Sequence, residues 1–294
     1  MENQPLVSVI ITTYRREMDL LMEAVNSVIH QSYRPIEIIL IDDNGEGTEH
    51  QKQNQQQFSS DESVRYFANK QNSGAQYSRN RGIFEAKGEF LAFLDDDDVW
   101  VQDKLQEQSI YFSDPTVGLI GCNGYIFYDS DFEKTTVYNQ NDAVNHPIGF
   151  QEMLAADCLG TTTQAVIRKE SILKAGLFDY FMPARQDYDM WLRISEHWQI
   201  RYVNKPLFYH RLHAGEQISK NGNKAYAGYQ RILHKYQDKY RKNRLARAKM
   251  HMKLSLSAYR CKRIPKAMSH MLKAFFSHPI CTMKTVLRHS SNQK

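Results

Sequence analysis

The sequence contains no long hydrophobic run and few cysteines, and both absences narrow the class of protein. No stretch of its 294 residues approaches the eighteen or more apolar residues that a membrane-spanning helix needs. The opening residues lack the charged-then-apolar start of a signal peptide. The four cysteines, Cys122, Cys158, Cys261 and Cys281, have neither the spacing of a metal site nor that of a disulfide framework. We therefore expect a cytoplasmic protein with reduced thiols.

Acidic residues are almost absent from the end of the chain. From Asn221 onward the sequence has 18 Lys and Arg against one acid, Asp238, which is a net charge of +17. The first 220 residues hold the remaining 20 basic and 32 acidic residues, a net charge of −12. A strongly basic segment favours a polyanionic partner, either nucleic acid or an anionic lipid surface.

The basic segment also carries an apolar stripe at helical spacing, after a proline that suits a first helical turn. The stripe and its proline are Ile264, Pro265, Met268, Met271, Leu272 and Phe275, with Lys262, Arg263, Lys266 and Lys273 among them. An amphipathic basic helix favours binding to a membrane surface over nucleic-acid recognition, so we expect no nucleic-acid partner. The alternative is that the stripe packs against the main domain while the lysines are solvated.

Four consecutive aspartates, Asp95–Asp98, follow the apolar run Phe90–Leu94. Carboxylates about 6 Å apart repel by roughly 2–3 kcal/mol at an effective dielectric near 20, so the cluster requires a cation. Side chains two apart on a strand share a face, which would place Asp95 beside Asp97. Their hard oxygens suit Mg²⁺ or Mn²⁺ that also holds a phosphate-bearing substrate. The alternative is a solvated acidic loop that caps a helix beginning near Asp103.

Strand and helix patterns alternate over the first hundred residues, which predicts a parallel α/β sheet. Ligands of such sheets bind at the carboxyl ends of the strands. That rule gathers Thr12–Tyr14, Asp42–Asp43 and Asp95–Asp98 at one edge. No G-x-G-x-x-G motif follows the first strand, so the dinucleotide fingerprint is absent. The expected strands are 6–12, 36–41, 64–68, 90–94, 117–128, 163–168 and 201–209, and the expected helices 17–30, 51–57, 76–86, 150–156 and one opening at 186.

Five motifs occur in a recognisable order over about the first 215 residues. They are Val7–Tyr14, Ile38–Asp43, Asn72–Gly74 with Ser78–Gly82, Gly88–Asp98, and Gln186–Arg193. In this order they resemble the inverting glycosyltransferases of family 2, which share the GT-A nucleotide-sugar fold. Two departures are Asn44-Gly45 after Asp43, where Gly-Ser is usual, and Gln186 in place of a glutamate.

The resemblance implies a mixed central sheet flanked by helices and followed by a C-terminal basic helical extension. We expect a nucleotide-sugar-binding half at 1–114, an acceptor-binding half at 115–220 and the extension at 221–294. The implied donor is a UDP-sugar. The implied acceptor is a glycan or lipid-linked glycan, and the protein would then be cytoplasmic or peripheral on the cytoplasmic face of the membrane.

The resemblance also implies roles for residues around the donor. Thr12 and Tyr14 would cradle the base and ribose, with the Tyr14 ring stacked on the base. Asp43, or else Asp42, would accept a hydrogen bond from the uracil imide. Arg79 would donate to the diphosphate through its planar guanidinium.

The metal and the catalytic base are implied in the same way. The family's metal motif fits Asp95-x-Asp97, or Asp96-Asp97 if it is aligned one residue over, so Asp97 is common to both. The other aspartate would bind the ribose hydroxyls or a metal-bound water. Asp187 would take the acceptor's proton, although it also suits a helix cap. His213 would close over the diphosphate as a further metal ligand, or be a surface histidine.

The expected function is thus metal-dependent, inverting transfer of a hexose or N-acetylhexosamine in cell-surface polysaccharide synthesis. A sugar nucleotidyltransferase is one rival, although the residues after the first strand are not glycine-rich as that class requires. A nucleic-acid-binding protein led by the basic tail is another, and a degenerate transferase kept only for binding is a third.

Overall fold

The computed structural model describes residues 4–128, 131–138, 146–212 and 221–291. The chain forms two compact units, each assembled from segments that are distant in the sequence. The first consists of Met1–Ile148, Leu159–Tyr180 and Arg193–Ala214, and the second of Gly149–Cys158, Phe181–Leu192 and Gly215–Lys294. Across the described segments, no helix combines the length and the apolar character needed to cross a membrane.

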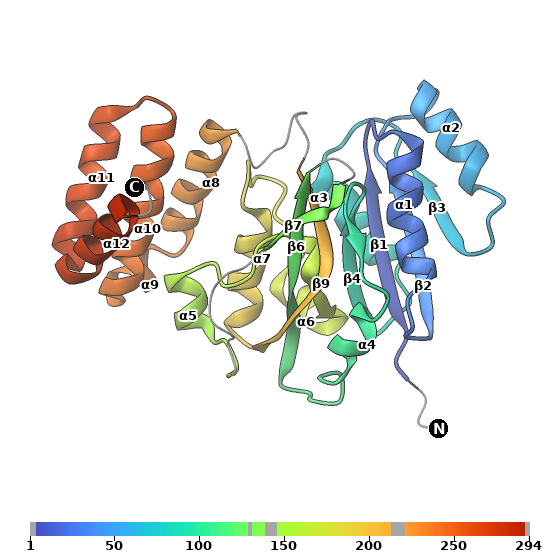
Figure 1. Cartoon of the computed structure of the whole chain (residues 1–294), viewed down its shortest axis with the longest axis horizontal. Helices are drawn as coiled ribbons and strands as arrows, with labels where there is room; N and C mark the ends of the chain where they lie inside the picture. Colours follow the sequence, from blue (N-terminus) through green and yellow to red (C-terminus); the bar gives the residue numbers. More distant parts are fainter. Residues whose placement is uncertain (1–3, 129–130, 139–145, 213–220, 292–294) are drawn as a thin grey trace. The chain divides into compact units, whose positions relative to one another are not determined.

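One mixed sheet, with nine strands among the described residues, is the framework of the first unit (Figure 1). The strands are β1 Val7–Thr13, β2 Ile36–Asp42, β3 Val64–Ala68, β4 Phe90–Asp95, β5 Val99–Trp100, β6 Val117–Tyr128, β7 Asp131–Val137, β8 Val166–Arg168 and β9 Gln199–Leu212. Their spatial order is β3-β2-β1-β4-β8-β6-β9-β5, with β7 paired to β6. The first four are parallel, as the strand–helix alternation predicts. β8 runs antiparallel to β4 and makes the sheet mixed.

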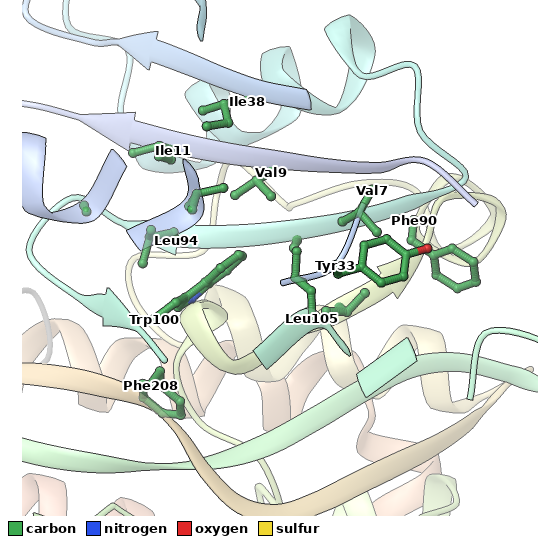
Figure 2. Packing of buried hydrophobic residues seen from close by; sticks show 14 of the residues in the cluster. Val7, Val9, Ile11, Tyr33, Ile38, Phe90, Leu94, Trp100, Leu105 and Phe208 are labelled. Carbon is green, nitrogen blue, oxygen red and sulfur yellow. The ribbon is translucent and has the colours of Figure 1, made fainter. Parts of the chain in front are cut away.

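Helices cover both faces of the parallel strands. The helices of this unit are α1 Met18–Ile29, α2 Glu49–Phe58, α3 Ala75–Glu85, α4 Lys104–Ser109 and α6 Lys169–Ala175, with the 3₁₀ turn η1 Thr162–Gln164. On one face, Val9 and Ile11 of β1 pack in one buried cluster with Val25 of α1 and Leu105 of α4 (Figure 2). On the other face α3 lies so close that a Cβ on Gly82 would stand 2.4 Å from Ile10 Cγ2. Since alternate residues of β1 serve two layers, the strand is apolar throughout.

The second unit is helical. Its helices are α5 Phe150–Ala155, α8 Gly222–Lys235, α9 Gln237–Lys242, α10 Arg244–Arg260, α11 Ile264–Ser277 and α12 Pro279–Ser291, and α7 Gln186–Ser195 begins in it. Helix α10 buries Ala246, Met250 and Leu254 and packs against α5, α8 and α11. The expected basic extension is therefore helical, with Pro265 in the first turn of α11.

Two local expectations differ from the structure. The segment Thr163–Arg168, expected to be one strand, is divided between η1 and β8. The glutamine-rich helix α2, expected to be exposed, buries Gln51 and Asn54. The polar side chain of Asn54 is buried because its amide donates to Asp42 Oδ2 at 2.8 Å.

Candidate functional site

Polar strand ends meet at one edge of the sheet in the first unit. In the parallel register Thr13 of β1 pairs with Asp42 at the end of β2. On its other side Thr12 pairs with Asp95 at the end of β4. The expectation that these three strand ends gather is confirmed, because parallel strands present their carboxyl ends at the same edge.

The aspartate run forms a turn and does not continue the strand. β4 ends at Asp95, and Asp98 N donates to Asp95 O at 3.1 Å. Strand alternation therefore stops there, and Asp97 is not brought beside Asp95 by the pleat as we expected. Instead Asp96 and Asp97 meet at Arg16, whose Nε donates to Asp96 Oδ1 and whose Nη2 donates to Asp97 Oδ2, both at 2.9 Å.

Arg16 is the cation that the aspartates require, and it stands three residues past the end of β1. Burial raises the pKa of Asp96 despite the Arg16 charge. Burial, with the charge of Asp98, also raises the pKa of Asp97 to about 7, again against Arg16. One guanidinium thus offsets only part of the cost of burying adjacent carboxylates. The sequence carried a signal for this pair, because two arginines follow a strand whose end adjoins that of β4.

Asp95 has a different set of partners. Its Oδ1 accepts from Arg79 Nη2 at 2.8 Å and from Thr162 Oγ1 at 3.3 Å, and its Oδ2 accepts from Thr161 Oγ1 at 3.2 Å. Burial alone would raise the pKa of Asp95, but the Arg79 charge and hydrogen bond hold it below its ordinary value. Arg79, expected to meet a diphosphate, here positions Asp95, and the threonines were not anticipated from the sequence.

Asp98 is fully buried and was not singled out from the sequence. It accepts from Thr163 Oγ1 at 2.6 Å, from Arg211 N at 3.0 Å and from His210 Nδ1 at 3.0 Å. Burial alone would lower the pKa of His210, but the Asp98 carboxylate raises it to about 9. Because Asp98 is neutralised within the fold, it is the least suited of the four to bind a ligand.

Two further contacts fix the turn to its surroundings. Arg211 Nε donates to the Asp97 carbonyl at 2.9 Å, and its Nη2 donates to Glu23 of α1. Arg211 is nearly fully buried and its guanidinium also lies over the Phe127 ring, 4.5 Å from the centroid. The backbone at Asp97 is therefore held by β9, which the sequence pattern did not indicate.

The motif Ser78–Gly82 on α3 ties the site together. Asn80 exchanges two hydrogen bonds of 2.9 Å with the backbone of Phe178. Arg81 Nη1 donates to Ala68 O at 2.6 Å, next to the end of β3. With Arg79 on Asp95, three consecutive side chains of one helix thus fix three separate segments around the sheet edge.

Asp42 and Asp43 are both buried but differ in their remaining capacity to accept hydrogen bonds. Asp42 accepts four bonds, all at 2.8 Å, from the backbone and side chain of Asn44, from Asn54 and from Tyr66. Asp43 accepts three, from Asn69 Nδ2 and the backbone nitrogens of Ser73 and Gly74. A carboxylate has about four lone-pair sites, so Asp43 keeps one and Asp42 none. The contacts favour Asp43 of the two for ligand recognition.

The residues after β1 present an aromatic ring at this edge. Thr12 is half-buried, whereas Tyr14 is exposed and has the Arg15 guanidinium 5.1 Å from its ring centroid. Arg15 has a φ of 52°, and its backbone nitrogen donates to Asn44 Oδ1 at 2.7 Å. This hydrogen bond holds a conformation that non-glycine residues rarely adopt. The Tyr14 ring is accessible for stacking, and the roles of Thr12 and Tyr14 stay predictions.

Asp187 belongs to the second unit, and His213 lies outside the described residues. Asp187 is half-buried in the first turn of α7, and its Oδ1 accepts from Tyr188 N at 2.7 Å. Its neighbour Asp189 is fully buried and pairs with Lys235 Nζ at 2.6 Å. The role of Asp187 as a base and that of His213 as a metal ligand stay predictions.

The donor set at the turn fits a hard divalent cation. Among the described residues, no group of three or more His, Cys, Asp or Glu side chains is arranged to hold a metal unaided. Mg²⁺ characteristically takes one or two protein carboxylates and completes its octahedron with phosphate oxygens and water. Asp97 with Asp95 or Asp96 meets that requirement, since all their donor atoms are carboxylate oxygens.

Comparison with known proteins adds relatives along most of the chain. The sequence model of glycosyl transferase family 2 matches residues 8–175, more than half of the chain. WcaA of Escherichia coli strain K12, named for colanic acid biosynthesis, is 28% identical over 252 residues, 82% of this chain and 84% of that protein. The UDP-Glc:alpha-D-GlcNAc-diphosphoundecaprenol beta-1,3-glucosyltransferase WfaP of Escherichia coli is 32% identical over 217 residues, 74% of this chain and 80% of that protein.

Solved structures share the fold at lower identity. TarS 1–349 of S. aureus in complex with UDP-GlcNAc superposes with a TM-score of 0.60 at 13% identity, over 92% of this chain and 91% of that one. The mannosyltransferase PcManGT from Pyrobaculum calidifontis, in complex with GDP-Man and Mn²⁺, gives a TM-score of 0.61 at 18% identity, over 99% and 81%. The architecture is thus the expected GT-A fold. With the family match over residues 8–175, this chain belongs to glycosyl transferase family 2.

Proposed function

We propose that the protein transfers one sugar from a UDP-sugar to a glycan carried on a lipid diphosphate, with inversion, during synthesis of a cell-surface polysaccharide. The names of its relatives support the parts of this proposal. WfaP uses UDP-Glc and acts on a diphosphoundecaprenol-linked sugar, and WcaA is named for colanic acid biosynthesis. TarS is bound to UDP-GlcNAc.

The observation that carries the proposal is the meeting of three strand ends with complementary chemistry. Asp43 keeps one lone-pair site for a base imide, and the exposed Tyr14 ring offers a stacking surface beside it in sequence register. Asp95–Asp97 supply hard oxygens at the neighbouring strand end. A uridine diphosphate has a planar base, a ribose and a dianionic diphosphate, so it requires all of these groups together.

Asp97 with Asp95 or Asp96 would hold Mg²⁺ or Mn²⁺, which when bound neutralises the charge that grows on the departing diphosphate. Arg16 donates to the same two carboxylates in this structure and so keeps them compensated before a nucleotide arrives. Arg79 keeps Asp95 ionised and oriented at the end of β4.

Inversion at the anomeric carbon needs one base on the acceptor side. A free sugar hydroxyl is a poor nucleophile at neutral pH, so a carboxylate has to take its proton as the new bond forms. We assign this role to Asp187. Its Oδ1 accepts from the backbone at the first turn of α7, and this hydrogen bond both orients the side chain and favours its ionised form.

The test is turnover of UDP-Glc and UDP-GlcNAc with an undecaprenyl-diphosphate-linked sugar as acceptor. Asp97→Asn is expected to lose at least about 100-fold in turnover together with metal-dependent UDP binding. Asp187→Asn is expected to keep UDP binding and to lose about 100-fold to 10,000-fold in turnover. Asp103→Asn is the matched control, since Asp103 is exposed at the end of the same segment, and it should keep parental rates.

Two results would contradict the proposal. One is near-parental turnover in either the Asp97 or the Asp187 variant. The other is release of pyrophosphate from UTP and a sugar 1-phosphate, because that reaction makes a nucleotide sugar and defines a nucleotidyltransferase.

A further inference from the structure

Helix α11 presents its large apolar side chains outward and its small ones inward. Its buried residues are Ala267, Ala274 and Ser277. By contrast Met268 is 63% exposed, Leu272 57% and Phe276 74%. These three recur every four residues and so share one side of the helix. A helix in a water-soluble fold normally buries such a stripe, so the arrangement is the reverse of an ordinary core helix.

The orientation of α11 is fixed by specific contacts within the second unit. Ser255 Oγ of α10 donates to Ala267 O at 2.8 Å. At the other end, Arg244 Nε donates to Ser277 O at 3.1 Å and Arg247 Nε donates to Ser277 Oγ at 2.9 Å. Both ends of the helix are thus held on α10 through its small-residue side. The expectation that the stripe packs against the main domain is not met for Met268, Leu272 and Phe276.

Helix α12 continues the same character. Ile280 is 65% exposed, Met283 55% and Leu287 65%. We call the exposed apolar residues of the two helices, Met268, Leu272, Phe276, Ile280, Met283 and Leu287, the C-terminal apolar surface. Singly exposed apolar residues are ordinary, but six on two consecutive helices mark an interaction surface.

The charge around the C-terminal apolar surface selects its partner. Exposed basic residues on the same helices and the turn before them are Lys262, Arg263, Lys266, Lys273 and Lys284. No acid occurs in the sequence after Asp238. A protein partner would need an unusually acidic rim around an apolar centre, whereas an anionic bilayer has that composition everywhere: negative headgroups over hydrocarbon.

We propose that α11 and α12 dock the protein onto an anionic lipid bilayer, with the C-terminal apolar surface inserted between headgroups. Helix α11 has 14 residues and a length of about 21 Å, less than the roughly 30 Å hydrocarbon core, so it lies in the plane of the interface. Lys266 and Lys273 meet the headgroup charge. The inference does not depend on which sugar is transferred, and it places the protein at the surface that holds a lipid-linked acceptor.

The test is co-sedimentation of the full-length chain with vesicles of phosphatidylcholine alone or with 30 mol% phosphatidylglycerol added, a mole fraction of roughly the size that gives an anionic leaflet its surface potential. The parent is expected to bind the anionic vesicles and to dissociate as salt is raised. Met268→Gln/Leu272→Gln should weaken binding at least about 30-fold without changing net charge. The matched control, Phe84→Gln/Ile110→Gln, removes two equally exposed apolar residues from the first unit and should bind as the parent does.

A second pair of variants separates charge from apolar insertion. Lys266→Gln/Lys273→Gln should weaken binding to anionic vesicles by about 30-fold, whereas Lys70→Gln/Lys87→Gln, exposed on the first unit, should have little effect. UDP-dependent thermal stabilisation of each variant, measured without lipid, reports whether the donor site is intact. Failure of donor binding would therefore be distinguishable from failure of docking.

Two outcomes would overturn the proposal. The first is parental co-sedimentation of Met268→Gln/Leu272→Gln and of Lys266→Gln/Lys273→Gln in folded protein. The second is a parent that ignores vesicles but self-associates in sedimentation velocity, with Met268→Gln/Leu272→Gln monomeric, because the surface would then be an interface between two copies of this chain.

Discussion

Arg16 gives the aspartate turn its charge balance in this structure. Its guanidinium pairs with Asp96 and Asp97 at 2.9 Å, and Arg79 pairs with Asp95 at 2.8 Å. His210 serves Asp98 in the same way. Each of the four carboxylates thus has a basic partner from a different part of the chain, which explains how the fold tolerates four adjacent acids.

Replacing Arg16 should make the stability of the protein depend on metal. Arg16→Gln leaves Asp96 and Asp97 buried without a cation and is expected to lower the free energy of unfolding by about 2–3 kcal/mol in EDTA. Mn²⁺ with UDP should restore more of that loss in the variant than it adds to the parent. Chemical denaturation with and without Mn²⁺ and UDP measures both effects.

Arg65→Gln is the control for this experiment. Arg65 pairs with Glu37 at 2.8 Å, away from the aspartate turn, so its loss should destabilise without a metal-specific recovery. Equal recovery in both variants, or none in Arg16→Gln, would show that Arg16 and the metal do not share the same carboxylates.

The His210–Asp98 pair should make stability depend on pH. The pKa of His210 is raised to about 9, so the folded state holds a proton that the unfolded state releases near 6.5. The resulting stabilisation is fully present below pH 6.5 and is lost as the pH rises through 9. For a shift of this size it amounts to about 3 kcal/mol.

His210→Gln should therefore flatten the fall in unfolding free energy between pH 6.5 and 9, measured by denaturant titration in EDTA. The exposed His197 provides the comparison, and His197→Gln should retain the parental slope. A parental slope in His210→Gln would mean that the imidazole is neutral beside Asp98.

At the scale of elements, the parallel half of the sheet could be predicted closely and the aspartate turn could not. β3 and β6 have the predicted bounds because apolar runs and flanking turn residues define them locally. The strand ends gather as predicted because the rule for parallel strands needs no side-chain detail. The partners of the aspartates come from Arg16, Thr161–Thr163 and His210, which are 53 or more residues from Asp95–Asp98 or follow a different strand, and no local pattern specifies them.

The close approach of α3 to β1 should make Gly82 intolerant of a side chain. A Cβ there would stand 2.4 Å from Ile10 Cγ2, so Gly82→Ala forces the helix away from the sheet. The expected loss is about 1–3 kcal/mol of unfolding free energy. Because Arg79 lies one turn earlier on α3, UDP binding should weaken as well.

Gly149→Ala is the matched control, because a Cβ on Gly149 meets no described atom within 4 Å and its φ of −100° suits any residue. Thermal unfolding and UDP titration of both variants check the prediction. Unchanged UDP affinity in a destabilised Gly82→Ala would show that α3 does not position the donor site.

The placement of α10 also decides how the C-terminal helices can be studied. Its residues Ala246, Met250 and Leu254 are buried, and Tyr188 of α7 donates to Met153 O within the same unit. Deleting 241–294 would remove part of that core along with the C-terminal apolar surface. Point substitutions on α11 are therefore the informative variants.

For the whole molecule, the opposite charges of its segments separate two tasks. The first 220 residues are acidic and carry the carboxylates proposed to bind the donor through a cation, and the remainder is basic with exposed apolar helices. An acidic donor region discourages free nucleotide from binding without metal, and a basic surface attracts anionic lipid. The two predicted activities can consequently be abolished independently.

The central claim is that a divalent ion links Asp97 to the nucleotide diphosphate, and Mn²⁺ binding followed by electron paramagnetic resonance tests it most directly. At pH 8, above the Asp97 pKa of about 7, the free Mn²⁺ signal of the parent and of Asp103→Asn should fall by one ion per protein only when UDP is added. Asp97→Asn should leave the signal unchanged under the same conditions. Equal uptake of Mn²⁺ by Asp97→Asn and the parent, or no dependence on UDP, would contradict the account.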